Sequence, residues 1–356
     1  MFEAHTQVTI YYILLSVFVL IFSALIALKP GTTSRYSSAI TTFLLIFCVL
    51  FIGWRQWWVQ EVYVDSVTYA YSYNNLAYST SDDAKDLGFY ALQSICKTCG
   101  LSVDMFFVIC ALFYVCLKVA TARTISPKYS FIIFLAMMTS IGFYNYGVNV
   151  VRAGIATSFM LLAFVKYEKF RTFCIYAVLG VLFHKSALLS LTAFICARLY
   201  NKNIKWYILI WLLAVPLSFV IKELATDFIM GVELISERAE DYLTGEADAD
   251  TFSHIGFRYD FVMFSAAPLF VGWYFIVKKK FADDFYRIMF CTYTLANAVW
   301  ILINDVPFSD RFAYLSWFMM PVIIFYPFLY CSNIRRRFPK IAMILVVQLV
   351  FILVLK

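Results

Sequence analysis

Long apolar segments recur along the whole chain and are separated by short polar stretches. Segments of about 17 or more mostly apolar residues can cross the roughly 30 Å hydrocarbon core of a bilayer as helices. The pattern predicts an all-α fold, a polytopic transmembrane helical bundle with about ten full spans. The spans are expected at 8–29, 37–54, 101–120, 129–148, 149–165, 206–222, 258–277, 285–303, 312–332 and 341–356.

One further apolar stretch, 172–197, has a polar pair at its centre. His184 and Lys185 lie in the sequence FHKSAL (183–188). A single span would bury Lys185 near the bilayer centre, at a cost of about 2.5–3.5 kcal/mol. Two short half-helices that meet at this pair avoid that cost, because broken helices are tolerated where they line a wet cavity. The stretch is therefore predicted to be one re-entrant helix pair.

The distribution of charge predicts the orientation. With the N-terminus outside and a re-entrant pair at 172–197, the inner loops collect 19 of the 29 Lys and Arg residues, whereas 19 of the 22 Asp and Glu residues lie outside or at outer helix ends. A single crossing would place the run 278–280 outside, against the positive-inside rule. We expect both termini outside and a single transmembrane domain, 1–356, with long outer segments at 55–100 and 223–257.

Composition agrees with this class. The chain is 63% hydrophobic and 14% charged, whereas a soluble domain has about 25% charged residues. The net charge of +7 resides mainly in the inner loops, so no nucleic-acid partner is predicted. Cys96 and Cys99 form a CxxC in the first outer segment, within an amphipathic helix predicted at 88–101. A helical pair is the simpler interpretation, and a disulfide remains open.

The first outer segment is rich in aromatic residues. Interfacial belts explain part of this enrichment, and a glycan surface explains the rest, because sugar rings stack their C–H faces on aromatic rings. The residues predicted to bind glycan are Tyr69, Tyr73, Trp57 and Trp58. The second outer segment, 223–257, has many carboxylates and is predicted to be a solvated acidic loop.

Ionisable residues that membrane burial penalises are functional candidates, and here they all map to the predicted outer side. Arg suits bidentate contact with phosphate oxygens. The predicted pyrophosphate ligands are Arg152, Arg311, Arg258, Arg55 and Lys185. For the pairs Arg258–Asp260 and Asp310–Arg311, ion pairs that stabilise helix ends are an equal alternative.

Two residues are candidates for the base that activates an acceptor hydroxyl, His184 and Asp65. His184 would lie at the re-entrant tip. Asp65 shares a predicted helix face with Tyr69 and Tyr73, since they recur every four residues. The choice between them stays open. No metal or cofactor is predicted, because the outer segments contain no His-rich constellation.

Six short motifs in one order resemble a known family. They are GWR (53–55), DSVTY (65–69), DLGFYAL (86–92), NVVRAGIATSF (149–159), FHKSAL (183–188) and DRFAYL (310–315). This order is similar to the EpsG-type membrane proteins of bacterial exopolysaccharide synthesis, which belong with the Wzy-type polysaccharide polymerases. Its most specific part is the Arg152 segment followed about 30 residues later by FHKSAL. The family often has Glu where this chain has Asp86, which puts a role for that carboxylate in doubt.

The resemblance implies an enzyme of the bacterial cytoplasmic (inner) membrane. It would polymerise undecaprenyl-pyrophosphate-linked oligosaccharide repeat units, as donor and acceptor, by metal-independent glycosyl transfer on the outer, periplasmic face. Such reactions build exopolysaccharide, O-antigen and capsule, with a chain-length regulator protein as a further partner. A flippase or exporter of lipid-linked glycan is the alternative. It would need access from both faces, and the outward clustering of the charges argues against it.

Overall fold

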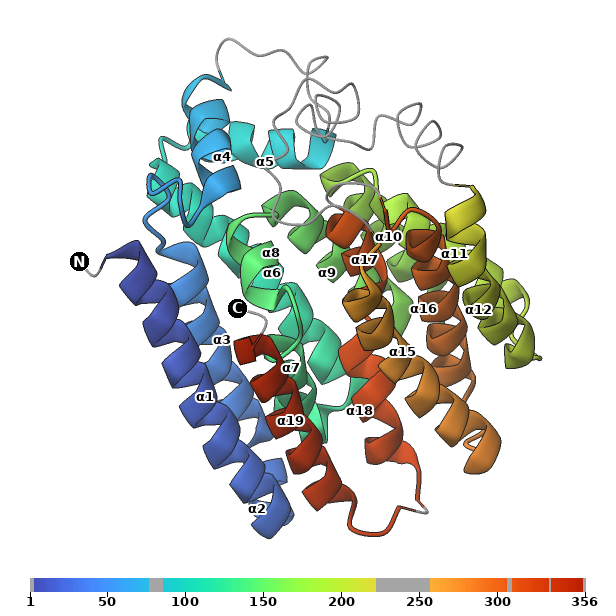
Figure 1. Cartoon of the computed structure of the whole chain (residues 1–356). Helices are drawn as coiled ribbons and strands as arrows, with labels where there is room; N and C mark the ends of the chain where they lie inside the picture. Colours follow the sequence, from blue (N-terminus) through green and yellow to red (C-terminus); the bar gives the residue numbers. More distant parts are fainter. Residues whose placement is uncertain (1–2, 77–85, 222–256, 306–308, 333, 355–356) are drawn as a thin grey trace. The chain divides into compact units, whose positions relative to one another are not determined.

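The computed structural model describes the chain except residues 1–2, 77–85, 222–256, 306–308, 333 and 355–356. The described residues form helices and turns without any strand (Figure 1), so the predicted all-α class is confirmed. The predicted acidic loop at 223–257 lies almost entirely outside the described residues.

The helices group into two compact units. The first comprises Met1–His184 and Phe328–Lys356, and the second comprises Lys185–Pro327. The helices of the first unit are α1 (Ala4–Leu28), α2 (Pro30–Arg35), α3 (Ser37–Gly53), α4 (Val64–Asn74), α5 (Leu87–Thr98), α6 (Val103–Ile125), α7 (Ser130–Met138), α8 (Phe143–Val148), α9 (Val151–Val165), α10 (Phe170–Phe183) and α19 (Arg337–Val354). Those of the second are α11 (Ala187–Leu199), α12 (Ile204–Val220), α15 (Tyr259–Trp273), α16 (Asp284–Leu302), α17 (Ser309–Trp317) and α18 (Met320–Tyr330), whose last turn belongs to the first unit.

Several helices suit a membrane. Among the described residues, five are long and apolar enough to cross one: Ala4–Leu28, Val103–Ile125, Tyr259–Lys278, Arg311–Tyr330 and Arg337–Val354. Other apolar helices, such as α9 and α12, have 10–17 residues. The multi-pass class is therefore supported, whereas the predicted number of about ten full spans is not confirmed.

The helical path breaks at two places, one inside a predicted span and one where a break was predicted. The expected span 129–148 is instead two helices: α7 ends at Met138, and α8 begins after Gly142, whose left-handed φ of 81° redirects the chain. The break predicted inside 172–197 is present: α10 ends at Phe183, His184 is extended with φ −162° and ψ 118°, and α11 begins at Ala187. The re-entrant course of the two halves stays a prediction.

Helix α6 is longer than the span predicted at 101–120, and it contains a buried basic residue. Lys118 lies inside α6, which continues to Ile125, and only 3% of it is exposed. Its Nζ is 4.7 Å from the centroid of the Tyr114 ring and 5.9 Å from that of Phe143. The apolar stem and these rings let α6 accommodate the ammonium group, a contact that hydropathy alone does not reveal.

Helix α9 forms the centre of the first unit, packed between α6 and α10. Its side chains are nearly all buried, and small residues let the neighbouring backbones approach closely. Gly154 is required for this packing, since a Cβ there would lie 2.2 Å from the carbonyl oxygen of Tyr146. The position of α9 is therefore tightly defined, and so is that of Arg152 in its first turn.

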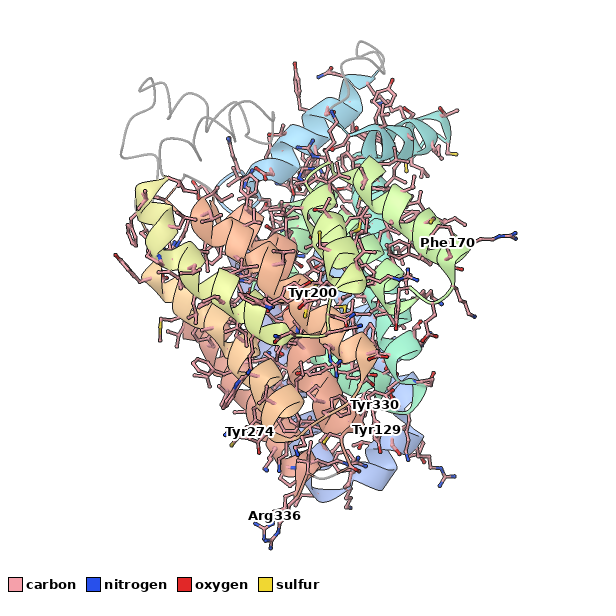
Figure 2. The ribbon with its side chains drawn as sticks, turned by 90° about the vertical axis from the view of Figure 1, so that its right-hand side faces the viewer. Tyr129, Phe170, Tyr200, Tyr274, Tyr330 and Arg336 are labelled. Atoms are coloured by element: carbon pink, nitrogen blue, oxygen red, sulfur yellow. The ribbon has the colours of Figure 1, made fainter. Side chains whose placement is uncertain are left out.

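The two ends of the first unit differ in character. Helices α4 and α5 lie at one end, and α2 lies at the other (Figure 1). Tyr129, Tyr330 and Arg336 lie at the α2 end, where Arg336 points away from the helices (Figure 2). There the Tyr330 hydroxyl donates to the carbonyl of Ile125, the last residue of α6. The α4–α5 end carries the candidate site.

A buried polar network holds the second unit together. Asn297 of α16 accepts a hydrogen bond from Trp211 Nε1 of α12 at 2.7 Å and donates to Ser265 Oγ at 3.2 Å and to Ser316 Oγ at 2.9 Å. Trp317 Nε1 also donates to Ser265 Oγ, at 2.8 Å. The network joins α12, α15, α16 and α17, and each of these polar atoms has a partner, as burial requires.

Candidate functional site

The first residue of the site is Asp86, which occupies the N-cap position of α5 but makes no capping hydrogen bond with its side chain. Asp86 immediately precedes α5, and its carbonyl accepts the first helical hydrogen bond, from the Tyr90 N–H at 3.1 Å. An Asp at this position usually accepts from the N–H groups of the first turn. Here the side chain makes no capping hydrogen bond, and the carboxylate is directed toward α9 and α10 instead.

Three side chains from three helix ends meet at this carboxylate. Asp86 Oδ2 accepts from Arg152 Nη1 at 2.7 Å and lies 3.1 Å from His184 Nδ1. The side chain of Asp86 is 5% exposed, whereas those of Arg152 and His184 are 35% and 30% exposed. The acid is therefore the buried centre of the cluster, and the two basic groups form its accessible surface.

Close backbone packing fixes the spacing of this cluster. A Cβ on Gly88 would lie 2.9 Å from the carbonyl carbon of Leu182, so the start of α5 touches the end of α10 backbone to backbone. Gly180 makes a similar close approach to α9, where a Cβ would meet the Met160 side chain at 2.7 Å. Because of these contacts, the start of α5, the start of α9 and the end of α10 lie next to one another, and these three helix ends carry Asp86, Arg152 and His184.

Helix α4 completes the surroundings. The Tyr69 ring centroid lies 5.7 Å from the Arg152 guanidinium carbon, and the same ring packs on Phe89 of α5 at 5.3 Å. Asp65, one turn earlier on α4, is half-buried and acts electrostatically on Arg152. The helix predicted to carry Asp65, Tyr69 and Tyr73 is thus confirmed, and Asp65 is near the cluster.

The chemistry available here is anion binding and proton transfer. Arg152 offers a guanidinium with further N–H donors, in the first turn of a helix whose free N–H groups and dipole also favour an anion. His184 offers an imidazole, which has one ring nitrogen that can accept a proton and one that can donate a hydrogen bond. Among the described residues, no group of three or more His, Cys, Asp or Glu side chains gathers in a way that could hold a metal ion.

Arg55 is buried, and its guanidinium donates hydrogen bonds to groups of the protein itself. It is 2% exposed, and it donates from Nε to Ser66 Oγ and from Nη1 to the Ile52 carbonyl, both at 2.8 Å. Its guanidinium carbon lies 3.9 Å from the centroid of the Phe107 ring. Ser66 in turn donates to the Val148 carbonyl at 2.6 Å. Arg55 therefore joins α3 to α4, α6 and α8.

The predicted glycan-binding aromatics divide into two groups. Tyr73 is buried, with its ring stacked on Phe106 at 4.7 Å and its hydroxyl bonded to the Leu101 carbonyl at 2.8 Å, so it offers no open face to a sugar. Tyr69 is buried beneath Arg152. Trp58 is exposed, and Trp57 is half-buried with its Nε1 donating to Asp104 at 2.9 Å. The tryptophans alone keep accessible ring surface for stacking.

The remaining predicted ligands belong to the second unit, namely Lys185, Arg258 and Arg311. Arg258 forms a bidentate pair with Asp260, with Nε–Oδ1 at 2.9 Å and Nη2–Oδ2 at 2.6 Å. The ion-pair alternative for these two residues is thus present. The side chain of Asp310 lies outside the described residues. In the first unit, Cys96 and Cys99 are both free thiols, so the structure contains no disulfide between them.

Asp86 is the residue that sequence reasoning missed. It lies in DLGFYAL, a motif that carries the family resemblance, but the Glu that the family often has at this position put a role for Asp86 in doubt. A usable signal existed, since Arg152 and His184, which lie 66 and 98 residues after Asp86, each belong to another motif of the same resemblance. Only the packing of α5 against α9 and α10 shows that these three polar residues meet.

The fold and the cluster together define a class: an all-helical, multi-pass membrane protein with a cationic and titratable group at one end of its bundle. The chain belongs to the EpsG family, whose model matches residues 39–356 and so includes the whole cluster. Membership in this family supports a polymerase-type function in polysaccharide synthesis. No curated protein and no solved structure gives a match to the chain.

Proposed function

We propose that this chain is a membrane glycosyltransferase that polymerises lipid-pyrophosphate-linked oligosaccharide repeat units. The observation that carries the proposal is the Arg152–Asp86–His184 cluster, which sets a phosphate-binding cation beside a group that can accept a proton. Glycosyl transfer from a lipid pyrophosphate needs both, because negative charge develops on the leaving pyrophosphate while the acceptor hydroxyl loses a proton.

Arg152 is the leading pyrophosphate ligand in this proposal. Asp86 orients its guanidinium through Nη1 and leaves other N–H groups for phosphate oxygens. Trp57 and Trp58 are proposed to stack on the glycan. The proposed donor and acceptor are undecaprenyl-pyrophosphate-linked repeat units, and the leaving-group charge is met by Arg152 without a metal.

The outer face of the bacterial cytoplasmic membrane is the proposed location of the reaction. The cluster lies at the α4–α5 end of the first unit, whereas basic residues such as Arg336 lie at the α2 end (Figure 2). Basic ends face the cytoplasm under the positive-inside rule. A chain-length regulator protein is proposed as a partner of the growing glycan.

The direct test uses purified full-length chain in detergent with lipid-linked repeat unit extracted from cells that lack the chain. Longer lipid-linked glycans should appear without any added energy source and should still appear with EDTA present. Arg152→Ala should abolish elongation, and Arg152→Lys should lower it strongly, by about tenfold or more, because the planar fork is lost. Arg123→Ala is the matched control, since Arg123 is exposed near the C-terminal end of α6 and donates a hydrogen bond to Thr42 Oγ1. An inert wild-type mixture, or a fully active Arg152→Ala, would overturn the proposal.

A further inference from the structure

The hydrogen bonding of His184 distinguishes its two ring nitrogens. Nδ1 lies 3.1 Å from Asp86 Oδ2, and an ionised carboxylate can only accept hydrogen bonds. The same oxygen already accepts from the Arg152 cation at 2.7 Å, which favours the ionised form of the acid. Nδ1 must therefore carry the proton, so that in the neutral imidazole Nε2 has a free lone pair.

Backbone contacts fix the positions of both partners in the hydrogen bond between His184 and Asp86. The His184 N–H donates to the Gly180 carbonyl at 3.1 Å at the end of α10, and Gly88 brings the backbone that follows Asp86 against Leu182. Acid and imidazole are thus anchored on two helix ends that touch each other. A buried carboxylate that orients a partly exposed imidazole is the arrangement that prepares a histidine as a general base.

We infer that Asp86 is a positioning residue, which fixes His184 as the Nδ1–H tautomer and leaves Nε2 as the base for the acceptor. This inference rests on the proposed function for its reaction. The acceptor sugar O–H gives its proton to Nε2 while its oxygen bonds to the anomeric carbon of the donor. The bond from that carbon to the pyrophosphate oxygen breaks, and lipid pyrophosphate leaves with the electron pair. The imidazolium formed beside Asp86 then returns its proton to solvent.

Because Asp86 Oδ2 contacts both Arg152 and His184, a change at Asp86 should affect pyrophosphate binding and kcat differently. Asp86→Asn removes one negative charge beside Arg152, so a pyrophosphate should bind as tightly as before or more tightly. The amide can also present its NH₂ to Nδ1 and select the other tautomer, so kcat should fall by about 10² to 10⁴. If Asp86 had only a structural role, Asp86→Asn would weaken pyrophosphate binding and lower kcat together.

The kinetic test compares wild type, Asp86→Asn, Asp86→Glu and His184→Gln, all full-length in nanodiscs. Binding is measured with farnesyl pyrophosphate as the probe, and kcat with lipid-linked repeat unit. We expect Asp86→Asn to lose kcat without a higher Kd and Asp86→Glu to recover part of it. The double variant Asp86→Asn/His184→Gln should be no slower than His184→Gln, because the two residues act as a unit. Glu61→Gln is the control, since Glu61 is an exposed carboxylate that pairs with His5 at 3.8 Å.

A spectroscopic test does not depend on the reaction. The chain has three histidines, so selective ¹⁵N-His labelling with His184→Gln as the assignment reference isolates the His184 signals. We expect the Nδ1–H, unprotonated Nε2 pattern in wild type and a mixture of tautomers in Asp86→Asn.

The outcomes separate this inference from the proposed function. If wild type polymerises and Arg152→Ala does not, but Asp86→Asn keeps its kcat or the Nε2–H tautomer dominates in wild type, the inference alone fails. A tenfold higher Kd in Asp86→Asn, with kcat lost in step, also overturns it in favour of a structural role. Inactivity of Asp65→Asn with full activity of His184→Gln would assign the base to Asp65. If wild type is inert but shows the expected tautomer, only the proposed function fails.

Discussion

A single methyl group at Gly88 should impair the site without touching any of its side chains. The Cβ of Gly88→Ala would lie 2.9 Å from the carbonyl carbon of Leu182 and 3.0 Å from its oxygen, whereas ordinary contact begins near 3.4 Å. Both obstacles are backbone atoms, so no side chain can rotate away. The start of α5 must therefore move from the end of α10 by about 0.4–0.5 Å.

This displacement acts unequally on the two hydrogen bonds of Asp86. The distance to His184 Nδ1 would grow from 3.1 Å to roughly 3.5 Å or more, beyond a useful hydrogen bond. The bond to Arg152 Nη1, which starts at 2.7 Å, can absorb the same shift and remain. The His184 contact should therefore be lost first, while Arg152 stays oriented.

We expect Gly88→Ala to lower kcat about tenfold, since small misplacements at a reacting group are costly. The Kd for farnesyl pyrophosphate should not change. The overpacking should cost about 1–3 kcal/mol of stability, which leaves the protein folded. The assay is elongation of lipid-linked repeat unit, together with the ¹⁵N signals of His184. Gly31→Ala is the matched control, because a Cβ there meets nothing within 4 Å. A folded Gly88→Ala protein with wild-type kcat and tautomer would refute the reasoning.

Two further predictions concern the rest of the chain. Asn297→Leu should destabilise the second unit by about 1–3 kcal/mol, because the buried Trp211 N–H loses its acceptor while Ser265 and Ser316 keep other bonds. Unfolding in detergent measures it, and Trp211→Phe in the same background should recover part of the loss; an unchanged midpoint would contradict the assigned network. Reporter fusions after Lys202 and Lys279 should both report the cytoplasmic side, and an outside signal at Lys279 would remove the re-entrant assignment of 172–197.

The sequence by itself determined the helical membrane class and the chemical types at the site. Hydropathy reflects the cost of burying each residue in lipid, so runs of apolar residues predict helices locally. The same cost predicted the break at His184, which the structure contains between α10 and α11. Local arguments also identified Arg152 and His184, because a charged or titratable group among apolar residues is conspicuous in one dimension.

Tertiary structure alone decided which of these groups meet, and which have other roles. Arg55 and Arg152 look equivalent in the sequence, yet Arg55 is buried against Ser66 and Phe107 whereas Arg152 reaches Asp86. Lys118 lies inside α6, and only the tertiary structure shows that the rings of Tyr114 and Phe143 lie beside its ammonium group. The sequence left the role of Asp86 in doubt, and the close approach of the α5 and α10 backbones shows that it lies beside His184. Such pairings depend on close contacts between segments about 66 to 98 residues apart, and no local preference of the chain encodes them.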